Sequence, residues 1–279
     1  MGHLGFVHNR NTENIGDLTC GPEDYFQFGE WENVHLPVEE TWGGLRLPVR
    51  CRHYILGGGG LFFNWNRDHL YRYCKDFQSI IIWGAGLNDD NPNVRSDAYP
   101  QWLKGATKLV GVRDYIGGLR WVPCPSCMSP AFDKKREIKR DFVIYEHPGK
   151  EIRFKSDIPR VSGDKPPTLE HALDYLGEAE TILTSSYHGA YWGTLLGRKV
   201  IMWSWSSKFL FMKHQQQLFD IRDSVKSWRV SALTKKAQLY PDALAECRQA
   251  NVEFHKDVME IVGEKWTTRL RPRNLGRKR

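Results

Sequence analysis

Residues 184–189 have the sequence Thr-Ser-Ser-Tyr-His-Gly and hold the side chains best suited to chemistry. The apolar residues 180–184 predict a short buried strand, and residues 189–196 predict a helix. The polar run would then lie at a strand-to-helix turn, where the first N–H groups of the helix lack intrahelical partners. Such a place favours an anion, and His188 adds a group that titrates near neutral pH.

A purely structural interpretation of this run stays open. Ser185 or Ser186 could simply cap the helix, and His188 could be a packed core residue. The functional interpretation makes His188 the catalytic candidate, with Ser185, Ser186 and Tyr187 as candidate substrate-binding residues.

A run of four glycines, residues 57–60, directly follows the predicted strand 52–56. Glycines at a strand end let backbone N–H groups approach a phosphate or carboxylate closely, which makes Gly58, Gly59 and Gly60 candidate ligand-binding residues. The run matches neither a P-loop nor a dinucleotide-binding fingerprint. A tight turn without a ligand is the alternative.

Polar residues also follow other predicted strands. Asn14 and Asp17 follow the strand 4–7, where they could bind a ligand or only shape a turn. Arg113 lies in the polar end of the strand 108–114 and could hold an anion or pair with Asp114. Lys208 follows the strand 199–203 and is a further candidate cation.

Metal, redox and serine-hydrolase chemistry find little support in the sequence. The six cysteines contain a single C-x-x-C pair, Cys124 and Cys127, which lies among prolines, so reduced structural thiols are expected. The chain has neither a second pair at zinc-site spacing nor a G-x-S-x-G turn. No metal ligand is therefore predicted.

Predicted strands and helices alternate along the chain, which favours an α/β fold with parallel sheets. The expected strands are residues 4–7, 34–36, 52–56, 79–83, 108–114, 141–147, 180–184 and 199–203. The expected helices are residues 68–77, 99–104, 168–177, 189–196 and 240–262. A proline-rich, charged segment, residues 123–140, would link two such units, and residues 159–167 would form a loop. A ligand is expected in a cleft at the carboxyl ends of the strands.

The chain has 279 residues and a net charge of +7, but the charge is concentrated at one end. Residues 269–279 carry six basic side chains and no acidic one, so we expect a disordered basic tail that could contact a membrane surface. The rest of the chain is nearly neutral, so no nucleic-acid partner is expected. Without an apolar run long enough to span a bilayer or a secretory signal, a cytoplasmic location is expected, with peripheral contact at the inner face of the membrane possible.

Taken together, these motifs resemble the polysaccharide pyruvyl transferase family. The matching segments, in order, are residues 14–17 (Asn-Ile-Gly-Asp), 56–61, 83–87, 111–114 (Gly-Val-Arg-Asp) and 184–189. The resemblance implies two Rossmann-like domains in a GT-B-like arrangement with an interdomain cleft. Residues 1–130 would form the N-terminal, acceptor-side domain, and residues 141–268 the C-terminal, donor-side domain.

The resemblance also implies a reaction. Phosphoenolpyruvate would be the donor substrate, no cofactor would be needed, and two hydroxyls of a cell-surface polysaccharide or its lipid-linked precursor would accept the pyruvyl group as a ketal. His188 matches the functional histidine of the family, and Arg113 and Lys208 would neutralise the donor. Ser186 stands where many members carry Arg. A GT-B-type glycosyltransferase that uses a nucleotide sugar, or a non-catalytic glycan-binding relative, are the alternatives.

Overall fold

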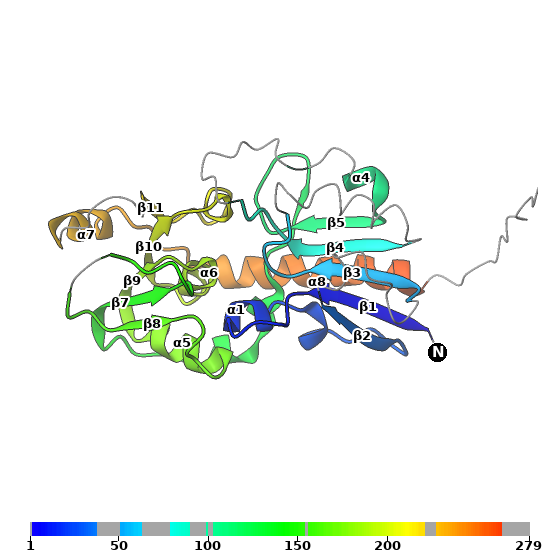
Figure 1. Cartoon of the computed structure of the whole chain (residues 1–279), viewed down its shortest axis with the longest axis horizontal. Helices are drawn as coiled ribbons and strands as arrows, with labels where there is room; N and C mark the ends of the chain where they lie inside the picture. Colours follow the sequence, from blue (N-terminus) through cyan, green and yellow to red (C-terminus); the bar gives the residue numbers. More distant parts are fainter. Residues whose placement is uncertain are drawn as a thin grey trace, which may run out of the picture.

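The computed structural model describes residues 2–37, 51–62, 79–89, 99, 103–153, 156–220 and 227–263. Two β-sheets follow one another along the long axis of the molecule (Figure 1). All the strand pairs within each sheet are parallel. The described residues therefore form an α/β fold, which confirms the prediction from the alternating elements.

The first sheet has the strand order β2-β1-β3-β4-β5-β6. Its strands are β1 (His3–His8), β2 (Glu32–Pro37), β3 (His53–Gly57), β4 (Ile80–Ala85), β5 (Leu109–Val112) and β6 (Arg120–Trp121). Every residue of β3 and β4 is buried, as is typical of parallel strands that are covered on both faces. This explains the unbroken apolar run Ile80–Trp83.

The second sheet has the strand order β11-β10-β9-β7-β8. Its strands are β7 (Arg140–Glu146), β8 (Arg160–Ser162), β9 (Ala179–Thr184), β10 (Lys199–Ser204) and β11 (Gln217–Asp220). The central strand β9 is paired on one side with β7 and on the other with β10. The chain leaves β9 directly into the helix that carries His188.

The described helices are of very different lengths. The α-helices are α1 (Ile15–Leu18), α4 (Leu103–Ala106), α5 (Leu169–Gly177), α6 (Tyr187–Leu195), α7 (Ser227–Thr234) and α8 (Ala243–Gly263). The 3₁₀ helices are η1 (Pro22–Asp24), η3 (Pro125–Met128), η4 (Pro130–Asp133) and η5 (Ser207–Phe209). All nine residues of α6 are buried, because this helix packs against α5, α8, β9 and β10.

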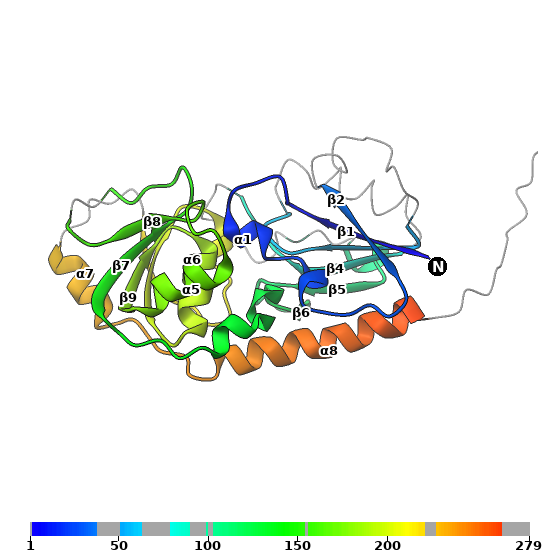
Figure 2. The ribbon, with the colours of Figure 1, turned by 90° about the horizontal axis from the view of Figure 1, so that it is seen from below.

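Helix α8 spans both sheets (Figure 2). Near its start, Ala243 and Cys247 belong to the apolar cluster that includes β9 and α6. Towards its end, Phe254 and Val258 belong to the apolar cluster of β1, β3 and β4. Between them the buried Asn251 accepts a hydrogen bond from the Trp83 indole of β4, at 2.8 Å.

The carboxyl ends of the two sets of strands meet. After β1, the backbone N–H of Ile15 donates to the carbonyl of Gly163, which follows β8. After β4, the backbone of Asp89 exchanges hydrogen bonds with Ser207, which follows β10. The guanidinium carbon of Arg113, after β5, lies 4.0 Å from the ring centroid of Tyr187, after β9. Segments far apart in the sequence are thus brought to one place.

The expected strands are confirmed within a few residues at their ends, and α8 confirms the long helix near the end of the chain. Three short strands, β6, β8 and β11, and the helix α7 were not predicted. Residues 159–167 were expected to form a loop, but β8 lies within them, and its three residues are too few to show a period. The predicted helix 68–77 lies outside the described residues, as does all but Tyr99, Leu103 and Lys104 of the predicted helix 99–104.

The predicted start of α6 was wrong by two residues. The helix begins at Tyr187, because the Ser186 side chain caps it by accepting a hydrogen bond from the N–H of Gly189 at 3.3 Å. His188 therefore lies in the first turn of α6 and not in a turn before it.

Candidate functional site

His188 occupies the centre of the meeting point between the two sheets. Its side chain is 4% exposed and packs on the Trp192 indole, one turn further along α6, at a ring distance of 5.1 Å. On another side it faces Gly16 of α1, where a β-carbon would overlap the Nδ1 atom of His188. The glycine in the Asn-Ile-Gly-Asp segment therefore allows α1 and α6 to approach each other.

Positive charge surrounds the imidazole. Burial is the largest cause that lowers the pKa of His188 well below its ordinary value, and the charges of Arg113, Lys208 and His147 lower it further. His188 lies at the N-terminus of α6, where the helix dipole also disfavours a cation. At neutral pH the free site therefore holds a neutral histidine among cations.

Arg113 is 3% exposed, and two contacts fix its guanidinium. Its guanidinium stacks on Tyr187, and one of its terminal nitrogens donates to the carbonyl of Leu87 at 3.1 Å. Its Nε atom is buried without a hydrogen-bond partner among the described residues. A buried cation with an unused donor has the chemistry to receive an anion.

The alternative for Arg113, an ion pair with Asp114, is not among the ion pairs of the described residues. The carboxylate of Asp114 instead accepts hydrogen bonds from the Tyr99 hydroxyl at 2.6 Å and from the Leu87 N–H at 2.7 Å. Burial raises the pKa of Asp114, and Arg113 opposes that rise. Asp114 thus stabilises the segment after β4 through the Leu87 N–H, and the Arg113 guanidinium stacks on Tyr187.

The ammonium groups of two lysines lie over the indole ring of Trp205. The Nζ of Lys208 lies 4.1 Å and that of Lys150 lies 4.4 Å from its ring centroid. The indole N–H of Trp205 donates to the carbonyl of Ser185 at 2.8 Å, which fixes the ring beside the start of α6. The ring of His147 packs against Trp205 as well, at 5.1 Å, and burial lowers the pKa of His147 to about 4.

Asp17 is the acidic member of the site. Its carboxylate accepts a hydrogen bond from the Asn14 side chain at 3.4 Å, and the Asn14 oxygen caps α1 at the N–H of Gly16. Burial raises the pKa of Asp17, while Lys208 and Arg113 lower it. Asp17 and its partner Asn14 therefore lie near the predicted cations Lys208 and Arg113. Asn14 also shapes the turn before α1, which was the alternative interpretation of this residue.

Ser185 and Ser186 are placed by the fold in structural roles. The hydroxyl of Ser185 donates to the carbonyl of Lys150 at 2.6 Å and accepts from the N–H of His147 at 3.0 Å. Ser186 caps α6. Both hydroxyls therefore have protein partners, and Ser185 holds the turn that bears Lys150.

The glycine run after β3 forms a tight turn against two neighbouring segments. Gly58 and Gly59 have φ values of 78° and 84°, which residues with a side chain rarely adopt. The N–H of Gly58 donates to Trp83, and the carbonyl of Gly59 accepts from Gly86. In the described part of the chain the N–H groups of Gly59 and Gly60 have no hydrogen-bond acceptor, and Gly59 lies near Asp17.

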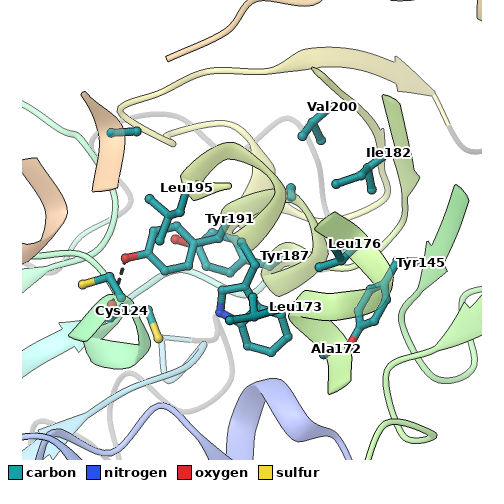
Figure 3. Close-up of a cluster of buried hydrophobic side chains, with 14 of the residues drawn as sticks. Cys124, Tyr145, Ala172, Leu173, Leu176, Ile182, Tyr187, Tyr191, Leu195 and Val200 are labelled. Atoms are coloured by element: carbon teal, nitrogen blue, oxygen red, sulfur yellow. Dashed lines mark hydrogen bonds between the residues drawn. The ribbon is translucent and has the colours of Figure 1, made fainter. Parts of the chain in front are cut away.

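Three residues of the site were not among those predicted from the sequence: Lys150, Trp205 and Cys124. The turn Pro148-Gly149 after β7 was the available signal for Lys150, since such a turn keeps the next side chain at the strand end. Cys124 lies with its Sγ 3.6 Å from the Nε2 of His188. Figure 3 shows the Tyr191 hydroxyl bonded to the carbonyl of Cys124, at 2.9 Å, within the apolar cluster around α6.

The described residues contain neither a cluster of metal ligands nor a membrane span. Among the described side chains no three His, Cys, Asp or Glu residues are grouped as metal ligands would be. The five described cysteines are free thiols. No helix in the described ranges is both long and apolar enough to cross a membrane.

The chain is similar in sequence to a known protein family. A family model described as polysaccharide pyruvyl transferase matches residues 18–207, which is more than half of the chain. The match ends at Ser207, so it includes β3, β4, Arg113 and the start of α6. No match to this chain was found among curated proteins.

Proposed function

The chain belongs to the polysaccharide pyruvyl transferase family, and from this premise we propose that it transfers a pyruvyl group from phosphoenolpyruvate to a sugar as a cyclic ketal. The observation that carries the proposal is the neutral His188 held beside Arg113 and Lys208, with Lys150 on the Trp205 ring that also carries Lys208. Phosphoenolpyruvate brings a phosphate and a carboxylate, and buried cations at a helix N-terminus are suited to both.

The proposed reaction needs an acid. A proton adds to the methylene carbon of the enol, one sugar hydroxyl attacks the neighbouring carbon, phosphate leaves, and a second hydroxyl closes the ketal. Of the two hydroxyl protons, one balances the proton of the new methyl group and the other leaves with phosphate. His188 becomes an acid when the charge of the bound donor offsets the cations that lower its pKa.

In the proposal, Lys150 and Lys208 supply the positive charge that an Arg at position 186 would provide, where this chain has Ser. Lys150 reaches Trp205 from the turn after β7, and Lys208 reaches it from η5, so the two ammonium groups lie on the ring beside the start of α6. In the proposal they grip the donor together with Arg113, and no metal ion is required. EDTA should therefore leave the rate unchanged.

The wider arrangement is proposed with the reaction. Residues 1–130 and 141–268 would be two Rossmann-like domains of a GT-B-like pair, supported by the two parallel sheets whose carboxyl ends meet. Phosphoenolpyruvate would serve as a donor substrate without any further cofactor. The acceptor would be a cell-surface glycan or its lipid-linked precursor, reached from the cytoplasm with the basic residues 269–279 at the membrane surface.

The test is phosphate release from phosphoenolpyruvate by the purified chain, measured with a panel of acceptor sugars. His188→Gln, which keeps most of the buried volume, should lower turnover by about 10²- to 10⁴-fold, the usual contribution of a general acid, and change the melting temperature little. Turnover of a nucleotide sugar with no phosphate release from phosphoenolpyruvate would contradict the proposal. A large fall in melting temperature would make His188 a packing residue.

A further inference from the structure

A chain of buried hydrogen bonds ends on the imidazole of His188. The indole nitrogen of Trp192 donates to the hydroxyl oxygen of Ser126 at 3.0 Å. That oxygen lies 3.2 Å from the Sγ of Cys124, and the same sulfur lies 3.6 Å from the Nε2 of His188. Ser126, Cys124 and Trp192 are fully buried.

The indole of Trp192 determines which group donates and which accepts in each of these hydrogen bonds. An indole N–H can only donate, so the Ser126 oxygen accepts from Trp192. Within the described residues the sulfur of Cys124 is the only partner to which the Ser126 hydroxyl can donate its own hydrogen. The thiol hydrogen of Cys124 then remains for the Nε2 of His188.

The thiol is suited to be a donor here. Burial raises the pKa of Cys124, so the sulfur keeps its hydrogen at neutral pH. Its position is fixed from behind as well, because the Tyr191 hydroxyl holds the Cys124 carbonyl (Figure 3).

We propose that Cys124 is a positioning residue that donates a hydrogen bond to Nε2 of His188 and so places the imidazole proton on Nδ1. This inference rests on the proposed function, in which His188 is the acid. Nδ1 is the ring nitrogen on the side of Gly16, in α1 of the N-terminal half. The resting histidine thus presents an N–H on that side. When phosphoenolpyruvate binds, Nε2 would take a second proton from solvent, and the sulfur of Cys124 would turn its own hydrogen away and accept the new N–H.

The tautomer of His188 can be measured without any turnover. In the full chain labelled with ¹⁵N-histidine, two-bond proton–nitrogen spectra above pH 7.5 identify which ring nitrogen carries the proton, and His188→Gln assigns the signal. The wild type should show the proton on Nδ1. Cys124→Ala should move it towards Nε2, the form that free histidine favours, whereas Cys124→Ser keeps a donor and should retain Nδ1–H.

Activity gives the second readout. Cys124→Ala should lower kcat by roughly 10- to 100-fold, the range found when a partner that orients a histidine is removed, with a much smaller change in KM. Ser126→Ala, which removes both the donor to Cys124 and the acceptor of the Trp192 indole, should show a weaker effect in the same direction.

The outcomes separate the two proposals. A proton on Nε2 in the wild type overturns the role of Cys124, whatever the activity, and this result does not depend on whether Cys124→Ala folds. A proton on Nδ1 in a chain that releases no phosphate from phosphoenolpyruvate leaves the positioning intact and contradicts the proposed function.

Discussion

At the scale of single residues, the cations near His188 act on its protonation. Arg113 and Lys208 both lower the pKa of His188, and burial lowers it most. A bound donor with negative charge would oppose the effect of these two cations, so we expect the pKa of His188 to rise on binding. If phosphoenolpyruvate is the donor, as proposed, we expect the protein to take up a proton when it binds.

This proton uptake predicts how donor affinity depends on pH. A group whose pKa rises on binding strengthens binding at low pH, so the affinity should fall as pH increases through the pKa of His188 in the complex. Calorimetry at pH 7.5–9 in buffers of different ionisation enthalpy measures the uptake directly. His188→Gln is the control, since it should bind with no uptake beyond that of the donor itself. Equal uptake in both proteins would contradict the prediction.

We expect Lys150 to strengthen donor binding, because its positive charge takes the place of the Arg that Ser186 replaces. Lys150→Met removes one charged contact, whose usual worth of about 1.5–3 kcal/mol predicts a weakening of donor binding by roughly tenfold or more. The fold should survive, because Ser185 holds Lys150 through its carbonyl and not its side chain.

Lys139→Met is the matched control for Lys150. Lys139 lies just before β7, at the opposite end of that strand, and pairs with Glu178. Donor affinity, measured by titration calorimetry, should not change in this variant. Equal losses in the two variants would mean that net charge and not position controls binding.

At the scale of elements, the contact between α1 and α6 sets the position of His188. Gly16→Ala would push a β-carbon into the imidazole, so one helix must shift. A misplacement near 1 Å at a reacting group can cost about 10²-fold in rate, and we expect a loss of that order in phosphate release. Gly117→Ala is the control, since a β-carbon there meets no atom within 4 Å. Unchanged activity of Gly16→Ala would mean that α1 does not position His188.

The elements also show what could be predicted from sequence alone. Long apolar runs such as Ile80–Trp83 identified the strands, and polar residues at their ends identified Arg113 and His188. The roles of Ser185 and Ser186 depended on which backbone groups the fold brings within reach, which no spacing records. Lys150 and Cys124 join the site only through tertiary contacts with Trp205 and His188.

At the scale of the whole molecule, several histidines are held neutral. Burial lowers the pKa of both His53 and His147 to about 4, and it also lowers the pKa values of His8, His188 and His255. In the unfolded chain these groups titrate near pH 6.5. As pH falls below that value, the unfolded state binds protons that the folded state does not, so stability is lost.

The expected result is a melting temperature that is constant above about pH 7 and falls steadily between pH 6.5 and 4. His53 lies in the first sheet with its Nδ1 bonded to Ser79 at 2.8 Å, away from the residues assigned to the donor. His53→Gln should reduce the fall of the melting temperature between pH 6.5 and 4 without changing donor affinity. If the melting temperature falls equally with pH in this variant and in the wild type, groups other than His53 cause the loss of stability in acid.

Helix α8 has a consequence for how the site meets its ligands. One continuous helix is anchored in the apolar clusters of both sheets, with Asn251 bonded to Trp83 between the two anchors. A hinge between the sheets would have to bend this helix or break that bond. We therefore expect little induced fit: the receptor for the donor exists before the donor arrives, ordering costs little entropy, and selectivity follows from the shape of a fixed site.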